Sequence, residues 1–157
     1  MSKLMIVLST IIPLSIYLVS NASAMGNQDS KPAVTTVDDF AEGKAAAYSG
    51  RYLEAIRLLK KVVDVEPKNA DAYNYLGYSY RKIGKLELAE SSYQYVFAIN
   101  PNHKGALEYQ GEMFLKQDNL SAAKKNLSRL KGLCPSGCKE LSELERAIAD
   151  FKAIRGN

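Results

Sequence analysis

The chain has 157 residues, of which 46% are hydrophobic and 24% are charged, and its formal net charge is +4. This length and composition are ordinary for about one folded domain. The net charge is small and both signs are interspersed along the chain, with no basic stripe. This charge pattern argues against a nucleic-acid partner, so we expect none.

Residues 1–24 are typical of a secretory signal peptide. Lys3 precedes the uncharged apolar run 4–19, and the Asn-Ala-Ser-Ala that follows supplies the small residues of a cleavage site. The alternative is an uncleaved membrane anchor, because the run is only slightly shorter than the minimum of about 17 residues that spans a bilayer. Residues 25–36 lack apolar periodicity and are predicted to be a flexible linker. Membrane attachment is expected only if the first segment is kept.

A period of 34 residues runs through the rest of the chain. The columns that repeat most clearly are Gly43, Gly77 and Gly111; Ala55, Ala89 and Ala123; and Pro67, Pro101 and Pro135. A fixed period of this length is the signature of paired-helix repeats. We expect helices over 37–49, 52–65, 70–83, 86–99, 104–117 and 120–132. Gly50 and Gly84 are expected to close the first helix of a pair in the left-handed conformation, and each proline to end the second helix.

This pattern resembles the tetratricopeptide repeat family, with residues 36–69, 70–103 and 104–137 as three successive repeats. The middle unit carries the family's residues at Tyr73, Leu76, Gly77, Tyr80, Ala89, Tyr93 and Pro101. The first unit departs from the family pattern at Asp39 and Ala46, as terminal repeats commonly do. The resemblance implies an all-α fold, a right-handed solenoid of three helical hairpins.

Residues 138–157 are predicted to form a capping helix and a short tail. Leu141, Leu144, Ile148 and Phe151 share one apolar stripe, and charged residues fill the opposite side. Such a helix covers the exposed end of a repeat stack with its apolar face, while its charged face meets water.

Cys134 and Cys138 are the only cysteines. In an exported protein they favour a disulfide at the corner before the capping helix. Redox and metal roles stay open. The Cys-x3-Cys spacing differs from the Cys-x2-Cys of thioredoxin-like sites. A zinc site needs two further ligands, and His103 is the sole histidine. We predict no metal and no cofactor, and interpret His103 as a solvated loop residue.

The first helices of tetratricopeptide hairpins line a concave groove that holds peptides. The resemblance places these residues there: Phe40, Lys44, Tyr48, Asn74, Tyr75, Tyr78, Arg81, Lys82, Glu108, Tyr109, Glu112 and Lys116. Tyrosine and arginine are enriched where binding energy concentrates. Chaperone-type members of the family grip a C-terminal carboxylate with a Lys/Asn/Arg clamp. In this chain Phe40, Lys44, Tyr75, Gly105 and Tyr109 occupy its places, so the clamp is absent. Several of the tyrosines could equally pack between helices.

Glu108 and Glu112, four residues apart on one helix, are interpreted as a solvated acidic face, because no histidine or third carboxylate accompanies them.

The patterns favour a non-enzymatic adaptor that binds a peptide or partner protein of unknown identity. By analogy with exported members of the family, we expect it in the periplasm, in a task such as envelope assembly, secretion or protein maturation. Two alternatives stay open. One is a thiol-redox protein that uses Cys134 and Cys138. The other is a self-assembling scaffold, in which the poorly capped first repeat stacks on a second copy.

Overall fold

The computed structural model describes residues 36–156, which form seven α-helices and, over that range, no strand. The predicted signal peptide, residues 1–24, and residues 25–35 of the predicted linker lie outside the described residues. Between residues 36 and 156, no helix is long and apolar enough to cross a membrane.

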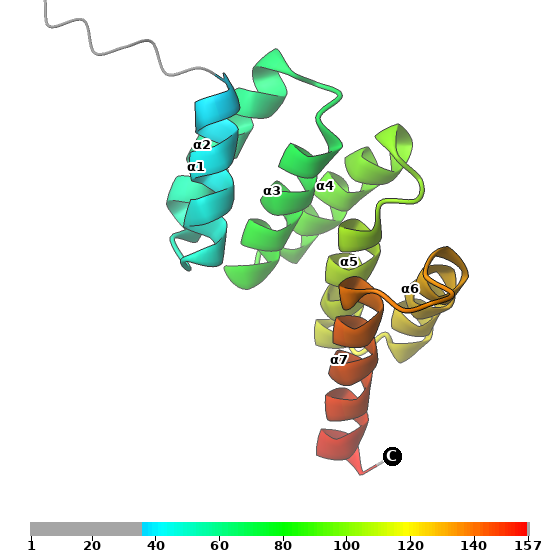
Figure 1. Cartoon of the computed structure of the whole chain (residues 1–157). Helices are drawn as coiled ribbons and strands as arrows, with labels where there is room; N and C mark the ends of the chain where they lie inside the picture. Colours follow the sequence, from blue (N-terminus) through cyan, green and yellow to red (C-terminus); the bar gives the residue numbers. More distant parts are fainter. Residues whose placement is uncertain (1–35, 157) are drawn as a thin grey trace, which may run out of the picture. The chain divides into compact units, whose positions relative to one another are not determined.

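Six of the helices pair as three successive hairpins, and the seventh follows them. The pairs are α1 (Thr36–Tyr48) with α2 (Tyr52–Val65), α3 (Ala70–Lys82) with α4 (Leu86–Ile99), and α5 (Lys104–Lys116) with α6 (Leu120–Leu133), before α7 (Lys139–Arg155). Each expected helix is present, and its ends differ from the expected ones by at most one residue. In Figure 1, α1, α3 and α5 follow one another across the molecule, with α2 behind α1 and with α4 and α6 to the right of α3 and α5. The all-α helical-repeat fold is therefore confirmed.

Left-handed residues and prolines end the helices where the repeat pattern predicts. Gly50 and Gly84, between the two helices of a hairpin, both have φ of +77°. Asp118 occupies the same column of the third unit and has φ of +60°. A proline directly follows the C-cap residue of each second helix, at positions 67, 101 and 135. A proline there cannot continue the helix, because it lacks the donor and disfavours helix in the residue before it.

Gly77 allows the two helices of the middle hairpin to approach closely. A Cβ atom at this position would lie 2.5 Å from Cε1 of Tyr93, whose side chain is fully buried. At the equivalent glycine of the third unit, Gly111, an added Cβ atom would instead lie 2.7 Å from the side chain of Leu144 in α7. The glycine column therefore serves the hairpin in the middle unit and the capping helix in the last one.

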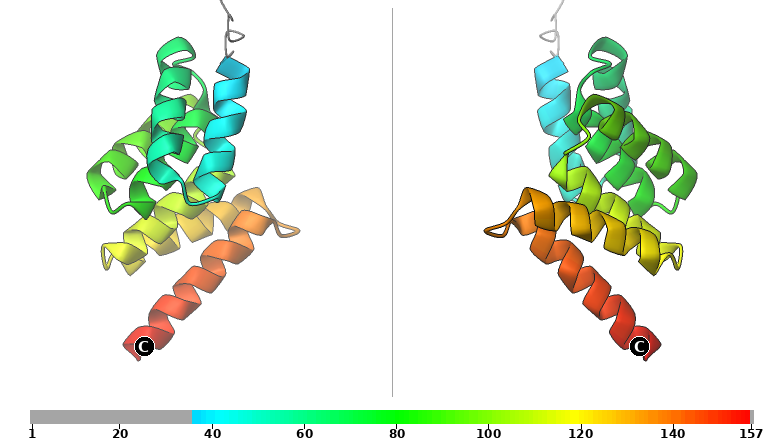
Figure 2. Two further views of the ribbon diagram at one scale, coloured as in Figure 1. Left: turned by 90° about the vertical axis from the view of Figure 1, so that its left-hand side faces the viewer. Right: turned by 90° about the vertical axis from the view of Figure 1, so that its right-hand side faces the viewer.

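The helix α7 closes the core at the end of the stack, as predicted. Leu144 and Ile148 are buried in one cluster with residues of α5 and α6, and Leu141 and Phe151 pack against that cluster. Both views of Figure 2 show the sharp corner at which the chain leaves α6 and enters α7.

Candidate peptide-binding groove

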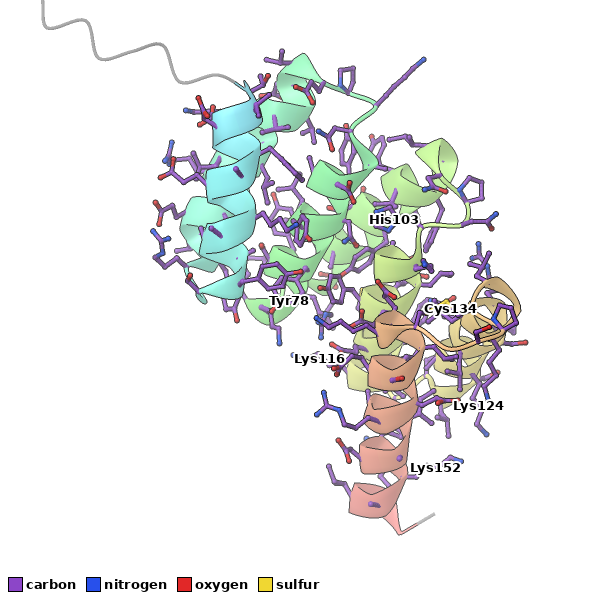
Figure 3. All side chains as sticks on the ribbon, in the orientation of Figure 1. Tyr78, His103, Lys116, Lys124, Cys134 and Lys152 are labelled. Atoms are coloured by element: carbon purple, nitrogen blue, oxygen red, sulfur yellow. A yellow bond between two sulfur atoms is a disulfide. The ribbon has the colours of Figure 1, made fainter. Side chains whose placement is uncertain are left out.

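Tyrosines from three repeats come together on the wall formed by α1, α3 and α5. The ring centroids of Tyr48 and Tyr75 are 5.6 Å apart, and those of Tyr78 and Tyr109 are 4.8 Å apart. The hydroxyl oxygens of Tyr48 and Tyr75 lie 3.2 Å from each other, and Phe40 extends the cluster at 6.1 Å from Tyr75. Figure 3 shows Tyr78 on this side of the molecule, near the end of α3. The repeat register thus gathers these aromatic residues, which are distant in the sequence, into one cluster.

Burial moves the pKa of the inner tyrosines further above neutral pH. Loss of solvent is the largest cause that raises the pKa of Tyr75 and of Tyr109, and hydrogen bonding with Tyr48 adds to it. Both hydroxyls therefore stay protonated at neutral pH. They can both donate and accept hydrogen bonds on this wall.

Arg81 is buried on the wall rather than exposed. Arg81 is only 2% exposed, and its Nη2 atom lies 2.6 Å from Oε2 of Glu112 on the next repeat. The guanidinium carbon is 5.5 Å from the ring centroid of Tyr78 and 5.8 Å from that of Tyr109. Arg81 is therefore a link between repeats, held by an ion pair and by cation–π contacts.

Glu108 and Glu112 do not form the solvated acidic face that the sequence suggested. Glu112 is paired with Arg81, and Glu108 is only 7% exposed. Burial, and to a smaller extent the neighbouring carboxylates Glu112, Glu140 and Glu143, together raise the pKa of Glu108 to about 8. Arg81 acts in the opposite direction with a smaller effect. The expectation failed because the packing of α7 on α5 removes solvent from this part of the α5 surface.

A cavity of about 190 Å³, here called the groove cavity, opens among these side chains. Seven predicted groove residues line it: Tyr48, Tyr78, Arg81, Lys82, Glu108, Tyr109 and Glu112. Two further lining residues, Lys139 and Glu143, come from α7 and were not predicted. The spacing of the apolar residues predicts that both lie on the solvent side of the capping helix. At 100° per residue both lie on the side of the helix away from its apolar stripe, so the sequence pattern carried no signal of this contact.

The remaining predicted groove residues lie outside the lining of the groove cavity. Asn74 is 3% exposed, and a Cβ added at Gly105 would lie 3.1 Å from its Nδ2 atom, so it is covered by the start of α5. Lys44 is exposed, with Nζ 5.4 Å from the ring centroid of Tyr75. Lys116 is exposed near the end of α5 (Figure 3). The available surface is thus smaller than the sequence implied.

His103 is a helix cap and not a solvated loop residue. Its Nδ1 accepts a hydrogen bond from the backbone N–H of Ala106 at 3.1 Å, and its Nε2 lies 2.9 Å from Oδ1 of Asp71 at the start of α3. The imidazole therefore satisfies an orphan donor of α5 and joins two repeats.

The two cysteines flank the corner between α6 and α7. The sulfur atoms of Cys134, which ends α6, and of Cys138, which precedes α7, are 2.22 Å apart, a disulfide-bonding distance. Among residues 36–156, no group of three or more His, Cys, Asp or Glu side chains is arranged to hold a metal ion.

Comparisons with known proteins agree with this architecture. The sequence profile described as tetratricopeptide repeat matches residues 40–103. The first TPR of Spaghetti (RPAP3), solved bound to the HSP90 peptide SRMEEVD, is 26% identical, with a TM-score of 0.64 over 75% of this chain and 93% of that chain. The first TPR domain of human RPAP3 is 24% identical, with a TM-score of 0.63 over 75% and 95% of the two chains. The Sgt2 TPR domain from Aspergillus fumigatus is 18% identical, with a TM-score of 0.65 over 77% and 79%. No curated protein matches the chain.

The hairpin stack with its groove is thus the fold of a helical-repeat protein of the kind that binds other proteins. Residues 40–103 match the tetratricopeptide repeat profile, and the fold of the described residues is that of solved tetratricopeptide repeat domains.

Proposed function

We propose that this chain is a non-catalytic adaptor that holds a peptide, or an extended segment of a partner protein, against the groove cavity and the tyrosines around it. The observation that carries the proposal is the convergence of Tyr48, Tyr78 and Tyr109 from three repeats on one cavity. Tyrosine offers a large, rigid contact area with a polar tip, so it is enriched where binding energy concentrates. The peptide bound to the first TPR of Spaghetti gives independent support for this class of ligand.

The peptide of this chain should differ from that of the Spaghetti domain. Where chaperone-type repeats carry a clamp for a terminal carboxylate, this chain has Phe40, Lys44, Tyr75, Gly105 and Tyr109. Only one of these five side chains is a cation. We therefore propose that affinity comes from aromatic contact in the middle of an extended segment, and not from capture of a C-terminal carboxylate.

We also propose that the adaptor is exported, and that it acts in the periplasm in envelope assembly, secretion or protein maturation. The support is the signal-like pattern of residues 1–24 and the cysteine pair at bonding distance, which suits an oxidising compartment. Cell fractionation tests this point. Recovery of the chain with periplasmic markers, shortened at its N-terminus, is the expected result, and recovery with cytoplasmic markers contradicts it.

A matched pair of tyrosine variants tests the binding proposal. Tyr48 and Tyr95 are both 55% exposed, but Tyr48 lines the groove cavity, whereas Tyr95 lies on α4 and stacks on Tyr73 with centroids 4.9 Å apart. We expect Tyr48→Ala to lose proteins that co-purify with the wild type, as identified by mass spectrometry, and Tyr95→Ala to keep them. If both variants keep the full set at equal folding, the groove is not the binding surface.

A further inference from the structure

Glu108 is a largely buried residue whose carboxyl group reaches the groove cavity and has no partner among the described residues. It is 7% exposed, yet none of residues 36–156 donates a hydrogen bond to its carboxylate or lies within ion-pairing distance of it. Buried ionisable groups are normally paired, because an unpaired charge loses its hydration without compensation. The side chain lines the groove cavity, so a molecule that enters the cavity can reach it.

The charges around Glu108 favour a cation as that molecule. The ionisable groups that surround it come from α3, α5 and α7: the carboxylates of Glu112, Glu140 and Glu143, and the cations Arg81, Lys82 and Lys139. Arg81 is already paired with Glu112, and Glu112, Glu140 and Glu143 each raise the pKa of Glu108, whereas Arg81 lowers it with a smaller effect. A cation placed beside the carboxylate of Glu108 relieves the repulsion from these carboxylates.

The walls and the size of the cavity suit a long side chain with a positive end. Tyr48, Tyr78 and Tyr109 offer aromatic rings, which attract cations within about 6 Å of the ring centroid. The cavity of about 190 Å³ has the volume of roughly six water molecules at ~30 Å³ each. That is room for one side chain, and not for a folded element.

We propose that the groove cavity receives a lysine or arginine side chain of the bound peptide, whose cationic group pairs with the Glu108 carboxylate against the wall of Tyr78 and Tyr109. This assignment rests on the proposed function, because it names the chemistry of the peptide that the groove binds. Glu108 is mostly protonated at pH 7, since its pKa is about 8. Binding of the cation therefore favours the ionised carboxylate and releases its proton to solvent.

A random peptide library displayed on phage, selected against the immobilised protein, provides the probes. We expect the selected peptides to be enriched in Lys or Arg at one position, and a selected peptide to lose at least tenfold in affinity when norleucine replaces that residue. Glu108→Gln should cause a similar loss. Glu87→Gln, an exposed carboxylate of α4, is the matched control and should bind as the wild type does.

The pH profile separates a direct contact from a merely structural role of Glu108. Between pH 6 and 7 the wild-type affinity should rise about tenfold, in step with the ionised fraction of a group with a pKa of about 8. The profile of Glu108→Gln should be flat.

Each outcome decides a different point. Peptides that depend on Tyr48 but show no basic preference, or that bind Glu108→Gln with wild-type affinity, overturn this inference and leave the proposed function standing. If no selected peptide depends on Tyr48, the proposed function fails, and this inference fails with it.

Discussion

Replacing Glu108 by glutamine measures the free energy of burying a carboxylate without a partner. The folded-state pKa of about 8 lies above the ordinary value of 4.5, so the folded protein binds this proton more tightly than the unfolded chain does. The stability that Glu108 contributes is therefore fully present below about pH 4.5 and is lost as the pH rises through 8. Glutamine resembles the protonated form in shape and does not titrate.

The size of the effect follows from the shift in pKa. One pKa unit corresponds to about 1.36 kcal/mol. For a shift from 4.5 to about 8, the wild type loses about 1 kcal/mol by pH 5, about 2 kcal/mol by pH 6 and about 3 kcal/mol by pH 7. The difference in free energy of unfolding between Glu108→Gln and wild type should grow along this curve. The variant should be the more stable protein at pH 7.

Urea unfolding followed by circular dichroism, repeated between pH 4.5 and 8, provides the measurement. Glu87→Gln serves as the exposed control and should parallel the wild type at every pH. A constant difference between Glu108→Gln and wild type over this pH range would refute the reasoning, because it would mean that Glu108 titrates as it does in the unfolded chain.

Four further changes test the fold. Gly77→Ala should destabilise the protein by about 1–3 kcal/mol, because the new methyl group meets a buried tyrosine ring. By contrast, Gly132→Ala on α6 adds a methyl group that meets open space, so it should stabilise the protein by about 0.5–1 kcal/mol. Equal effects of the two alanine variants in urea unfolding would contradict the close approach of α3 and α4 at Gly77. Replacing Cys134 and Cys138 by serine should lower the free energy of unfolding by about 2 kcal/mol, because the disulfide closes a five-residue loop and so limits the entropy of the unfolded chain. Partner binding should stay intact. Loss of binding at equal folding would instead favour the thiol-redox alternative. His103→Ala should cost about 1 kcal/mol by removing the cap of α5, and an unchanged thermal midpoint would show that the cap contributes nothing.

The helical architecture could be predicted because it depends on local chemistry that repeats. Gly50 and Gly84 need no tertiary context to favour a left-handed turn, and Pro67 and Pro101 end a helix wherever they stand. With the period known, helix ends followed to within one residue. The buried face of the capping helix could be predicted equally well, because the spacing of its apolar residues defines which face packs against the core.

The groove could be predicted only in part, because the exposure of a polar side chain depends on the neighbouring helix. The repeat register correctly brings Tyr48 and Tyr109 to one wall. It does not indicate that α7 lies along α5 and buries Glu108, or that Arg81 turns inward to pair with a glutamate of the next repeat. The same limit explains His103, whose imidazole contacts Asp71, 32 residues earlier in the chain, as well as capping α5.

Site-directed photo-cross-linking tests the central claim most directly, that partners are held on the wall of α1, α3 and α5. A benzophenone side chain would replace Tyr48 in one variant and Tyr95 in the other, two tyrosines of equal exposure, in the cells that produce the protein. Illumination should yield a discrete partner adduct from position 48 and none from position 95. Adducts of equal yield from both positions, or from position 95 alone, would contradict the account.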